Sequence, residues 1–135
     1  WEYSGGGCIL TADTPSISIS NGGAQTLSVE APAHAGKSYW IFGSISGTSP
    51  GVSLLGVNIP LNPDLYTNFT IASPNAPPFT TFRGPLDAAG KGTGVFTLPA
   101  NVLTATFSLN HAFVVFDSAG RFHCASNAVE LQFVQ

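Results

Sequence analysis

Charge is the property that this chain most lacks. Asp, Glu, Lys and Arg make up 8% of its 135 residues, whereas they make up roughly a quarter of an ordinary globular protein. The four basic residues, Lys37, Arg83, Lys91 and Arg121, are scattered singly, and the net charge is −3. Because a protein binds the phosphate backbone through clustered positive charge, this distribution argues against nucleic acid as a partner.

Long hydrophobic runs are also missing. No run approaches the roughly 18 apolar residues of a membrane-spanning helix, so we expect no membrane span. Hydrophobic residues still reach 44%, and Ser, Thr, Asn, Gly and Pro take the place of the missing charges. Such a neutral, hydroxyl-rich composition is common in extracellular β-proteins, whereas Lys and Glu dominate the exposed faces of helical cytosolic domains. The composition therefore predicts an extracellular or cell-surface protein.

Cysteine is limited to Cys8 and Cys124, one near each end of the chain. Their even number and the extracellular composition predict a disulfide between them, formed in an oxidising compartment. Two separate buried thiols are the alternative. The sequence contains no CxxC motif, so nothing in the cysteine spacing indicates a metal or redox site.

Two similar tetrapeptides, Asp87–Gly90 and Asp117–Gly120, each join two strand-like runs. Asp at the first position of a type I turn accepts a hydrogen bond from the backbone two residues on, and Gly at the fourth position adopts the left-handed conformation. We predict that both are β-hairpin turns, with Asp87, Gly90, Asp117 and Gly120 as the turn residues. The pair favours an antiparallel all-β fold.

Apolar residues recur with period two, as in Ile17 and Ile19 or Leu131 and Phe133, and helical periodicity is absent. We predict an all-β, antiparallel two-sheet β-sandwich with Ig-like or jelly-roll-like Greek-key connections and 8–9 short strands. The runs 39–42 and 112–116 are apolar on both faces and are expected to be central strands. Their side chains Trp40, Phe42, Phe113 and Val115 would form the core between the sheets. Further strands are expected near residues 65–71, 79–83, 94–98 and 103–109.

The first twelve residues are predicted to be an arm, followed by a single sandwich domain at 13–135. Trp1, Tyr3, Ile9 and Leu10 make this arm apolar, and the glycines at 5–7 give it a flexible joint. An extended apolar strand can complete the exposed sheet edge of another molecule. We therefore expect the arm to mediate assembly by strand exchange, which produces filaments when the rotation between subunits does not close.

One segment matches a catalytic motif. Gly47–Gly51 has the G-x-S-x-G pattern of a nucleophile elbow, and Asp64 and His111 follow in hydrolase order. The residue after the nucleophile must donate its backbone N–H to the oxyanion, and Pro50 has no N–H. We interpret the segment as a Pro-Gly turn, assign no catalytic residues and expect that the protein is not an enzyme.

Metal ligands and cofactor motifs are not evident from spacing. His34, His111 and His123 are not spaced as ligands, and the aspartates lack the D-x-[DN]-x-[DN] pattern of a calcium loop. We predict no metal site and no cofactor, and leave open a calcium site built from distant loops.

Turn and strand-end motifs stand at Ser44–Gly51, Ile59–Asp64, Leu86–Gly90, Leu98–Pro99, His111–Val115 and Ala125–Val129, together with the opening Tyr3–Cys8. As a set they resemble a module found, often at the C-terminal end, in secreted proteins of planctomycete-type bacteria. The resemblance covers roughly residues 24–135 well and the first dozen loosely. It implies an exported, non-catalytic β-domain and supplies no catalytic residue.

These observations predict a non-catalytic extracellular module for structure or attachment. Its partner would be another copy of the chain or another domain of a larger secreted protein. The alternative is a carbohydrate-binding module, whose polysaccharide would stack on exposed aromatic rings. The candidate rings are Trp1, Tyr3, Tyr39, Trp40 and Tyr66. A small hydrolase ranks third.

Overall fold

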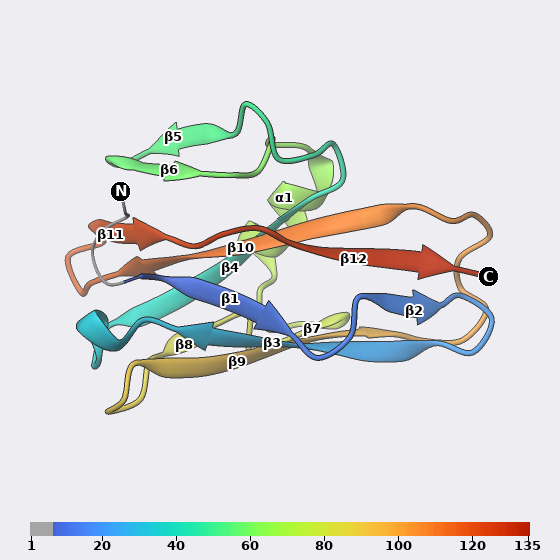
Figure 1. The fold of residues 1–135 in the computed structure, drawn as a ribbon, viewed down its shortest axis with the longest axis horizontal. Helices are drawn as coiled ribbons and strands as arrows, with labels where there is room; N and C mark the ends of the chain where they lie inside the picture. Colours follow the sequence, from blue (N-terminus) through green and yellow to red (C-terminus); the bar gives the residue numbers. More distant parts are fainter. Residues whose placement is uncertain (1–6) are drawn as a thin grey trace.

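The protein is an all-β sandwich with one α-helix and one short 3₁₀ helix in the computed structural model, which describes residues 7–135 (Figure 1). The strands are shorter and more numerous than the 8–9 predicted. They are β1 (Ile9–Ala12), β2 (Ser16–Ser18), β3 (Gly23–Glu30), β4 (Ser38–Ser44), β5 (Val52–Leu54), β6 (Val57–Ile59), β7 (Phe79–Thr80), β8 (Arg83–Pro85), β9 (Lys91–Leu98), β10 (Ser108–Phe116), β11 (Phe122–Ala125) and β12 (Val129–Val134). The helices are η1 (Pro32–His34) and α1 (Leu65–Ala72).

Two sheets form the sandwich. One has the strand order β1-β3-β9-β7, and the other has the order β2-β12-β10-β4-β8 with β11 paired to β10. All pairs are antiparallel except β2 with β12, which is parallel. The strands β10 and β4 are neighbours at the centre of the larger sheet, which confirms the prediction for the runs 39–42 and 112–116.

Residues 8–12, which the sequence assigned to an arm, belong to the sandwich instead. β1 pairs with β3 from Ile9 opposite Glu30 to Ala12 opposite Leu27. The Leu10 side chain is buried in the core of its own domain, while Ile9 is exposed. Two of the four residues predicted to mediate assembly are thus used in the chain's own sheet, and Trp1 and Tyr3 lie outside the described residues. The alternation of Ile9 and Leu10 suits this edge position because one strand face meets the core.

The main core lies between the two sheets and contains Phe113 and Val115, as predicted. Phe42 belongs instead to a second apolar cluster on the outer face of the larger sheet, with Trp40 packed against it. The residues of β4 that enter the main core are Tyr39 and Ile41. Because side chains alternate between the faces of a strand, Trp40 and Phe42 cannot share the face of Tyr39 and Ile41.

The second cluster is covered by the β5–β6 hairpin, and α1 also packs against β4 (Figure 1). The prediction of a strand over 65–71 is wrong. Asp64 caps α1 by accepting a hydrogen bond from the Thr67 N–H at 3.1 Å, while the Thr67 hydroxyl accepts one from the Asp64 N–H at 3.0 Å. The prediction of a strand over 103–109 is also largely wrong, since β10 begins only at Ser108.

The two predicted turns have the same local geometry. Asp87 Oδ1 accepts hydrogen bonds from the backbone of Ala89 and Lys91, Asp117 Oδ1 makes the equivalent pair, and Gly90 and Gly120 have φ of 77° and 81°. Their places in the fold differ. The turn at Asp117 joins the paired strands β10 and β11, whereas the turn at Asp87 leads from β8 in one sheet to β9 in the other. Only the turn at Asp117 is therefore a β-hairpin.

Neither helix in the described part of the chain has the length and apolar character needed to cross a membrane.

Candidate functional site

An apolar groove of about 550 Å³ opens where the two sheets meet α1 and the segment 99–107. Lys, Arg, Asp, Glu and His are all absent from its lining, so the groove offers apolar surface with a few hydroxyl groups. The lining residues are Ile45, Tyr66, Phe69, Ser73, Ala76, Pro77, Pro78, Phe79, Phe96, Thr97, Leu98, Pro99, Val102, Leu103, Phe107, Leu109 and Phe133.

Large apolar side chains stand exposed around this groove. Phe69 is 57% exposed, Val102 55% and Ile45 52%, and Phe107 is also exposed. Phe69 comes from α1 and Val102 from the segment after β9, so distant parts of the chain supply the rim. Single exposed apolar residues are ordinary, but several around one charge-free hollow are typical of an interaction surface.

Tyr66 forms part of the groove wall and contacts a buried histidine. Its hydroxyl shares a hydrogen bond of 2.6 Å with His111 Nε2. Burial lowers the pKa of His111 to about 3 and raises the pKa of Tyr66, so both groups are neutral at pH 7. His111 Nδ1 has no hydrogen-bond partner among the described residues. A Cβ atom at Gly43 would collide with the Tyr66 ring, which explains the glycine at this point of β4.

The residues of the hydrolase-like motif are engaged elsewhere. Asp64 Oδ2 accepts hydrogen bonds from the backbone of Ile45 and Ser46 and from the hydroxyl of Ser46, each at 2.8 Å. Burial by itself would raise the pKa of Asp64, but these bonds and the one from Thr67 lower it overall below its ordinary value. Asp64 thus fixes the start of α1 and the loop after β4, and His111 bonds to Tyr66.

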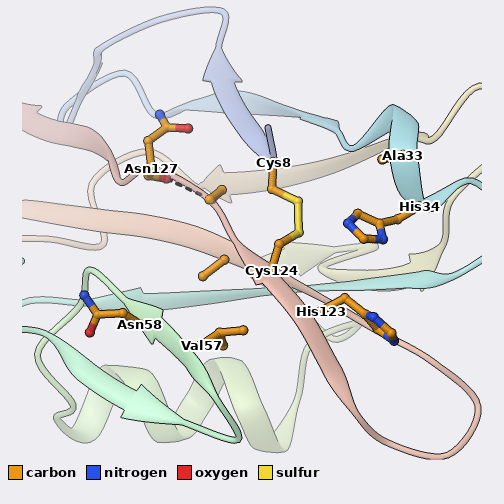
Figure 2. Close-up of a pocket in the computed structure, with 10 residues that line it drawn as sticks. Cys8, Ala33, His34, Val57, Asn58, His123, Cys124 and Asn127 are labelled. Atoms are coloured by element: carbon orange, nitrogen blue, oxygen red, sulfur yellow. Dashed lines mark hydrogen bonds between the residues drawn. A yellow bond between two sulfur atoms is a disulfide. The ribbon is translucent and has the colours of Figure 1, made fainter. Parts of the chain in front are cut away.

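A second cavity, of about 570 Å³, lies at the predicted disulfide (Figure 2). Cys8 and Cys124 are bonded, with their Cα atoms 6.4 Å apart, which confirms the pairing. The bond joins the start of β1 in one sheet to β11 in the other. His34 and His123 also line this cavity, with ring centroids 5.6 Å apart.

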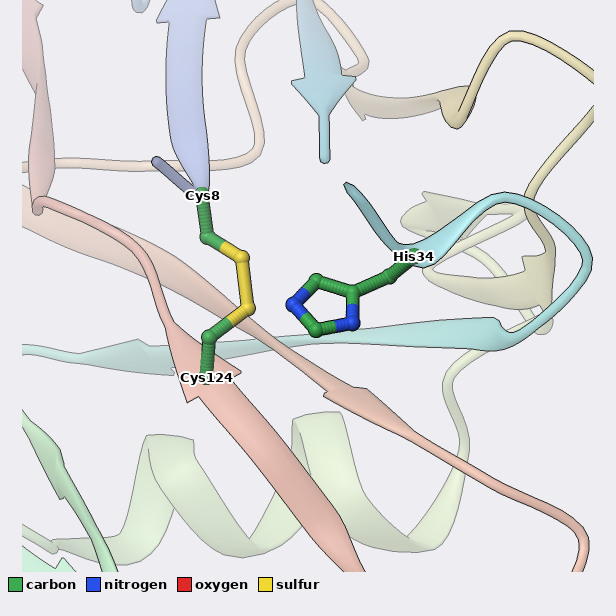
Figure 3. Close-up of side chains that lie close together, drawn as sticks. All are labelled: Cys8, His34 and Cys124. Atoms are coloured by element: carbon green, nitrogen blue, oxygen red, sulfur yellow. A yellow bond between two sulfur atoms is a disulfide. The ribbon is translucent and has the colours of Figure 1, made fainter. Parts of the chain in front are cut away.

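The His34 ring points at the disulfide (Figure 3). One ligand-type atom from each of Cys8, His34 and Cys124 lies within 4.8 Å of the other two. Burial, followed by the nearby Lys37 and His123, lowers the pKa of His34. No hydrogen bond within residues 7–135 involves a ring nitrogen of His34, whereas His123 Nε2 donates to Asp117 Oδ2 at 2.8 Å.

Two of the aromatic residues considered for sugar stacking make contacts within the domain. Tyr39 is buried, and its hydroxyl donates to the carbonyls of Thr81 and Thr93. The Trp40 ring lies under the guanidinium carbon of Arg83, which is 4.3 Å from the ring centroid. Trp1 and Tyr3 are outside the described residues.

Comparison with protein-family models gives no match for this chain, and comparison with curated proteins gives none either.

Sequence reasoning found the disulfide but neither cavity. The groove combines residues from 45 to 133, and no local pattern relates them. His34 lies 26 residues from Cys8 and 90 from Cys124, far outside the spacings of short metal motifs. A signal for the start of α1 was present in the sequence, because Asp is a preferred N-cap residue and Asp64 directly precedes the helix.

Proposed function

We propose that this chain is a non-catalytic extracellular attachment module that binds a second copy of itself through the apolar groove. The observation that carries the proposal is the combination, on one surface, of a charge-free hollow and exposed large apolar side chains. The disulfide supports an oxidising, extracellular setting. The motifs that resemble the planctomycete-type secreted module support an exported, non-catalytic domain.

The partner is inferred from the chemistry of the groove. A lining without charged groups offers nothing to a charged ligand and favours apolar side chains. The rim itself presents such side chains, in Phe69, Val102 and Ile45. A two-fold symmetric dimer requires one patch that is complementary to itself, and a hollow beside protruding side chains meets this requirement. The net charge of −3 adds little repulsion between copies.

This contact differs from strand exchange through the N-terminal arm. The disulfide ties Cys8 to Cys124, and the Asn127 side chain bonds to both the N–H and the carbonyl of Leu10, at 2.9 and 3.0 Å. β1 is thereby held in its own domain. We accordingly place the attachment surface at the groove.

Sedimentation velocity over a range of concentrations tests the proposal, with Phe69→Ser as the variant and Leu55→Ser as the control. Leu55 is 63% exposed, lies at the β5–β6 turn and does not line the groove. Each buried Phe contributes about 2 kcal/mol, and a symmetric dimer contains two, so Phe69→Ser should weaken dimerisation by tenfold or more. Leu55→Ser should leave it unchanged. A wild-type chain that stays monomeric up to about 1 mM would refute the proposal.

A further inference from the structure

We propose that the cavity at the disulfide becomes a zinc site when the Cys8–Cys124 bond is reduced, with Cys8, Cys124 and His34 as the protein ligands. The inference is independent of the groove and of dimerisation. It rests on the mutual distances of the three donor atoms, which all lie within 4.8 Å of one another (Figure 3).

The donor set is one that zinc prefers. Zinc is bound by cysteine thiolates at about 2.3 Å and by imidazole nitrogen at about 2.0–2.1 Å, usually with tetrahedral geometry. At these distances, two thiolates on one ion are about 3.7 Å apart. The two sulfur atoms, once unbonded, therefore need to separate by only about 2 Å. Two cysteines and one histidine leave the fourth position to water, which the open cavity of about 570 Å³ admits.

The three ligands are held by parts of the fold that do not depend on the disulfide. Cys8 is next to β1, which is paired with β3 and anchored by the Asn127 side chain at Leu10. Cys124 lies opposite Val115 in the β10–β11 hairpin. His34 belongs to η1, where its backbone N–H donates to the Ala31 carbonyl at 2.9 Å. Reduction would therefore leave the ligands near their present places.

A thiol reductant can open the Cys8–Cys124 disulfide. Two thiol groups of the reductant give up two hydrogen atoms and become a disulfide, the Cys8–Cys124 bond breaks, and each cysteine takes one hydrogen. Binding of zinc then replaces the two thiol protons, which pass to solvent as the Zn–S bonds form. The oxidised protein lacks both thiolates, so the site exists only in the reduced state.

In the test the full chain is reduced under anaerobic conditions by a phosphine, which takes oxygen from one water molecule to become the phosphine oxide while each cysteine gains one of its hydrogens. Competition with a chromophoric zinc chelator then measures the affinity. The reduced protein should bind one Zn²⁺, and Co²⁺ as a spectroscopic probe should give tetrahedral d–d bands and sulfur-to-metal charge transfer. The oxidised protein should bind neither ion. His34→Ala should weaken zinc binding by about 100-fold or more, because even the loss of a ligand's outer-shell partner costs about 10–100-fold.

His123→Ala is the matched control, because His123 lines the same cavity but bonds to Asp117 and is not one of the three ligands. It should change the affinity by less than about tenfold. Circular dichroism of the reduced protein reports whether the sheet persists. Zinc binding by an unfolded chain would show no preference for His34 over His123, and equal losses in the two variants would overturn the proposal. Absence of zinc binding by a folded, reduced protein would overturn it as well.

Discussion

Acid should destabilise this protein as the pH falls below about 6.5, because of one buried histidine. His111 is fully buried beside Phe82 and Phe96, and its Nε2 is bonded to the Tyr66 hydroxyl. Desolvation lowers its pKa to about 3 in the folded protein, from an ordinary value of 6.5. The folded state therefore keeps His111 neutral at a pH where the unfolded chain is protonated.

Proton linkage gives the direction and the size of the change in the free energy of unfolding. Between pH 6.5 and pH 3 the unfolded chain binds one proton more than the folded protein at His111, so the free energy of unfolding falls as pH falls. The slope for one proton is about 1.4 kcal/mol per pH unit. At pH 6.5 only half of the unfolded chains carry this proton, so from pH 6.5 to pH 4.5 the loss is about 2 kcal/mol. The pKa values of Asp64, Asp87 and Asp117 are lowered from 3.8, so these groups act only below this interval.

Urea unfolding of the wild type and His111→Gln at several pH values between 7 and 4.5 isolates this effect. Gln keeps a polar group near the Tyr66 hydroxyl but does not titrate. The variant should be less stable at pH 7, yet between pH 7 and pH 4.5 it should lose about 2–3 kcal/mol less than the wild type. His34, whose pKa is also lowered, is present in both proteins. Its contribution to the pH dependence of stability is therefore the same in both and cancels in the comparison.

Equal pH dependence in the two proteins would refute the reasoning. If His111→Gln does not fold, NMR of ¹⁵N-labelled histidine in the wild type gives the answer directly. One of the three imidazoles should remain neutral down to pH 4.5, and protonation of all three above that pH would show that His111 is not desolvated.

Two further predictions concern stability and are measured by guanidinium unfolding. Phe113→Ala should cost about 3–5 kcal/mol because Phe113 is fully buried between the sheets, whereas Leu55→Ala, at an exposed leucine outside the groove, should stay within about 0.5 kcal/mol. A loss below about 1 kcal/mol at Phe113 would contradict its central position. Gly120→Ala should cost about 1 kcal/mol for the left-handed backbone alone, since no atom lies within 4 Å of the added Cβ. Gly90→Ala should cost about 1–3 kcal/mol more, because its Cβ would meet the backbone of Ala31 and Pro32, and equal losses at the two glycines would contradict this packing.

The local features of this protein could be predicted from its sequence because each depends on a few neighbouring residues. The period-two pattern identified strands such as β2 and β12, and two Asp-x-x-Gly segments identified two turns whose geometry is nearly identical. The pairing of Cys8 with Cys124 needed only an even count and a composition typical of an oxidising compartment.

Tertiary structure decided how these pieces are used. The same turn joins two paired strands at Asp117 but carries the chain between sheets at Asp87. The strands that flank Asp87 pair with the distant strands β4 and β3 instead of with each other. The sequence favoured a strand over 65–71, where Asp64 instead caps a helix that packs against β4. The arrangement of side chains on β4 likewise depends on which face meets the other sheet, and the sequence of a strand that is apolar on both faces does not specify this.

Neither cavity could be predicted from the sequence, for the same reason. His34 meets Cys8 and Cys124 only because η1, β1 and β11 converge, and the groove forms only because α1 and the segment 99–107 flank the opening between the sheets. Composition and periodicity report on the chain within a few residues, whereas a site made from segments a hundred residues apart is created by packing and therefore becomes visible only in the folded molecule.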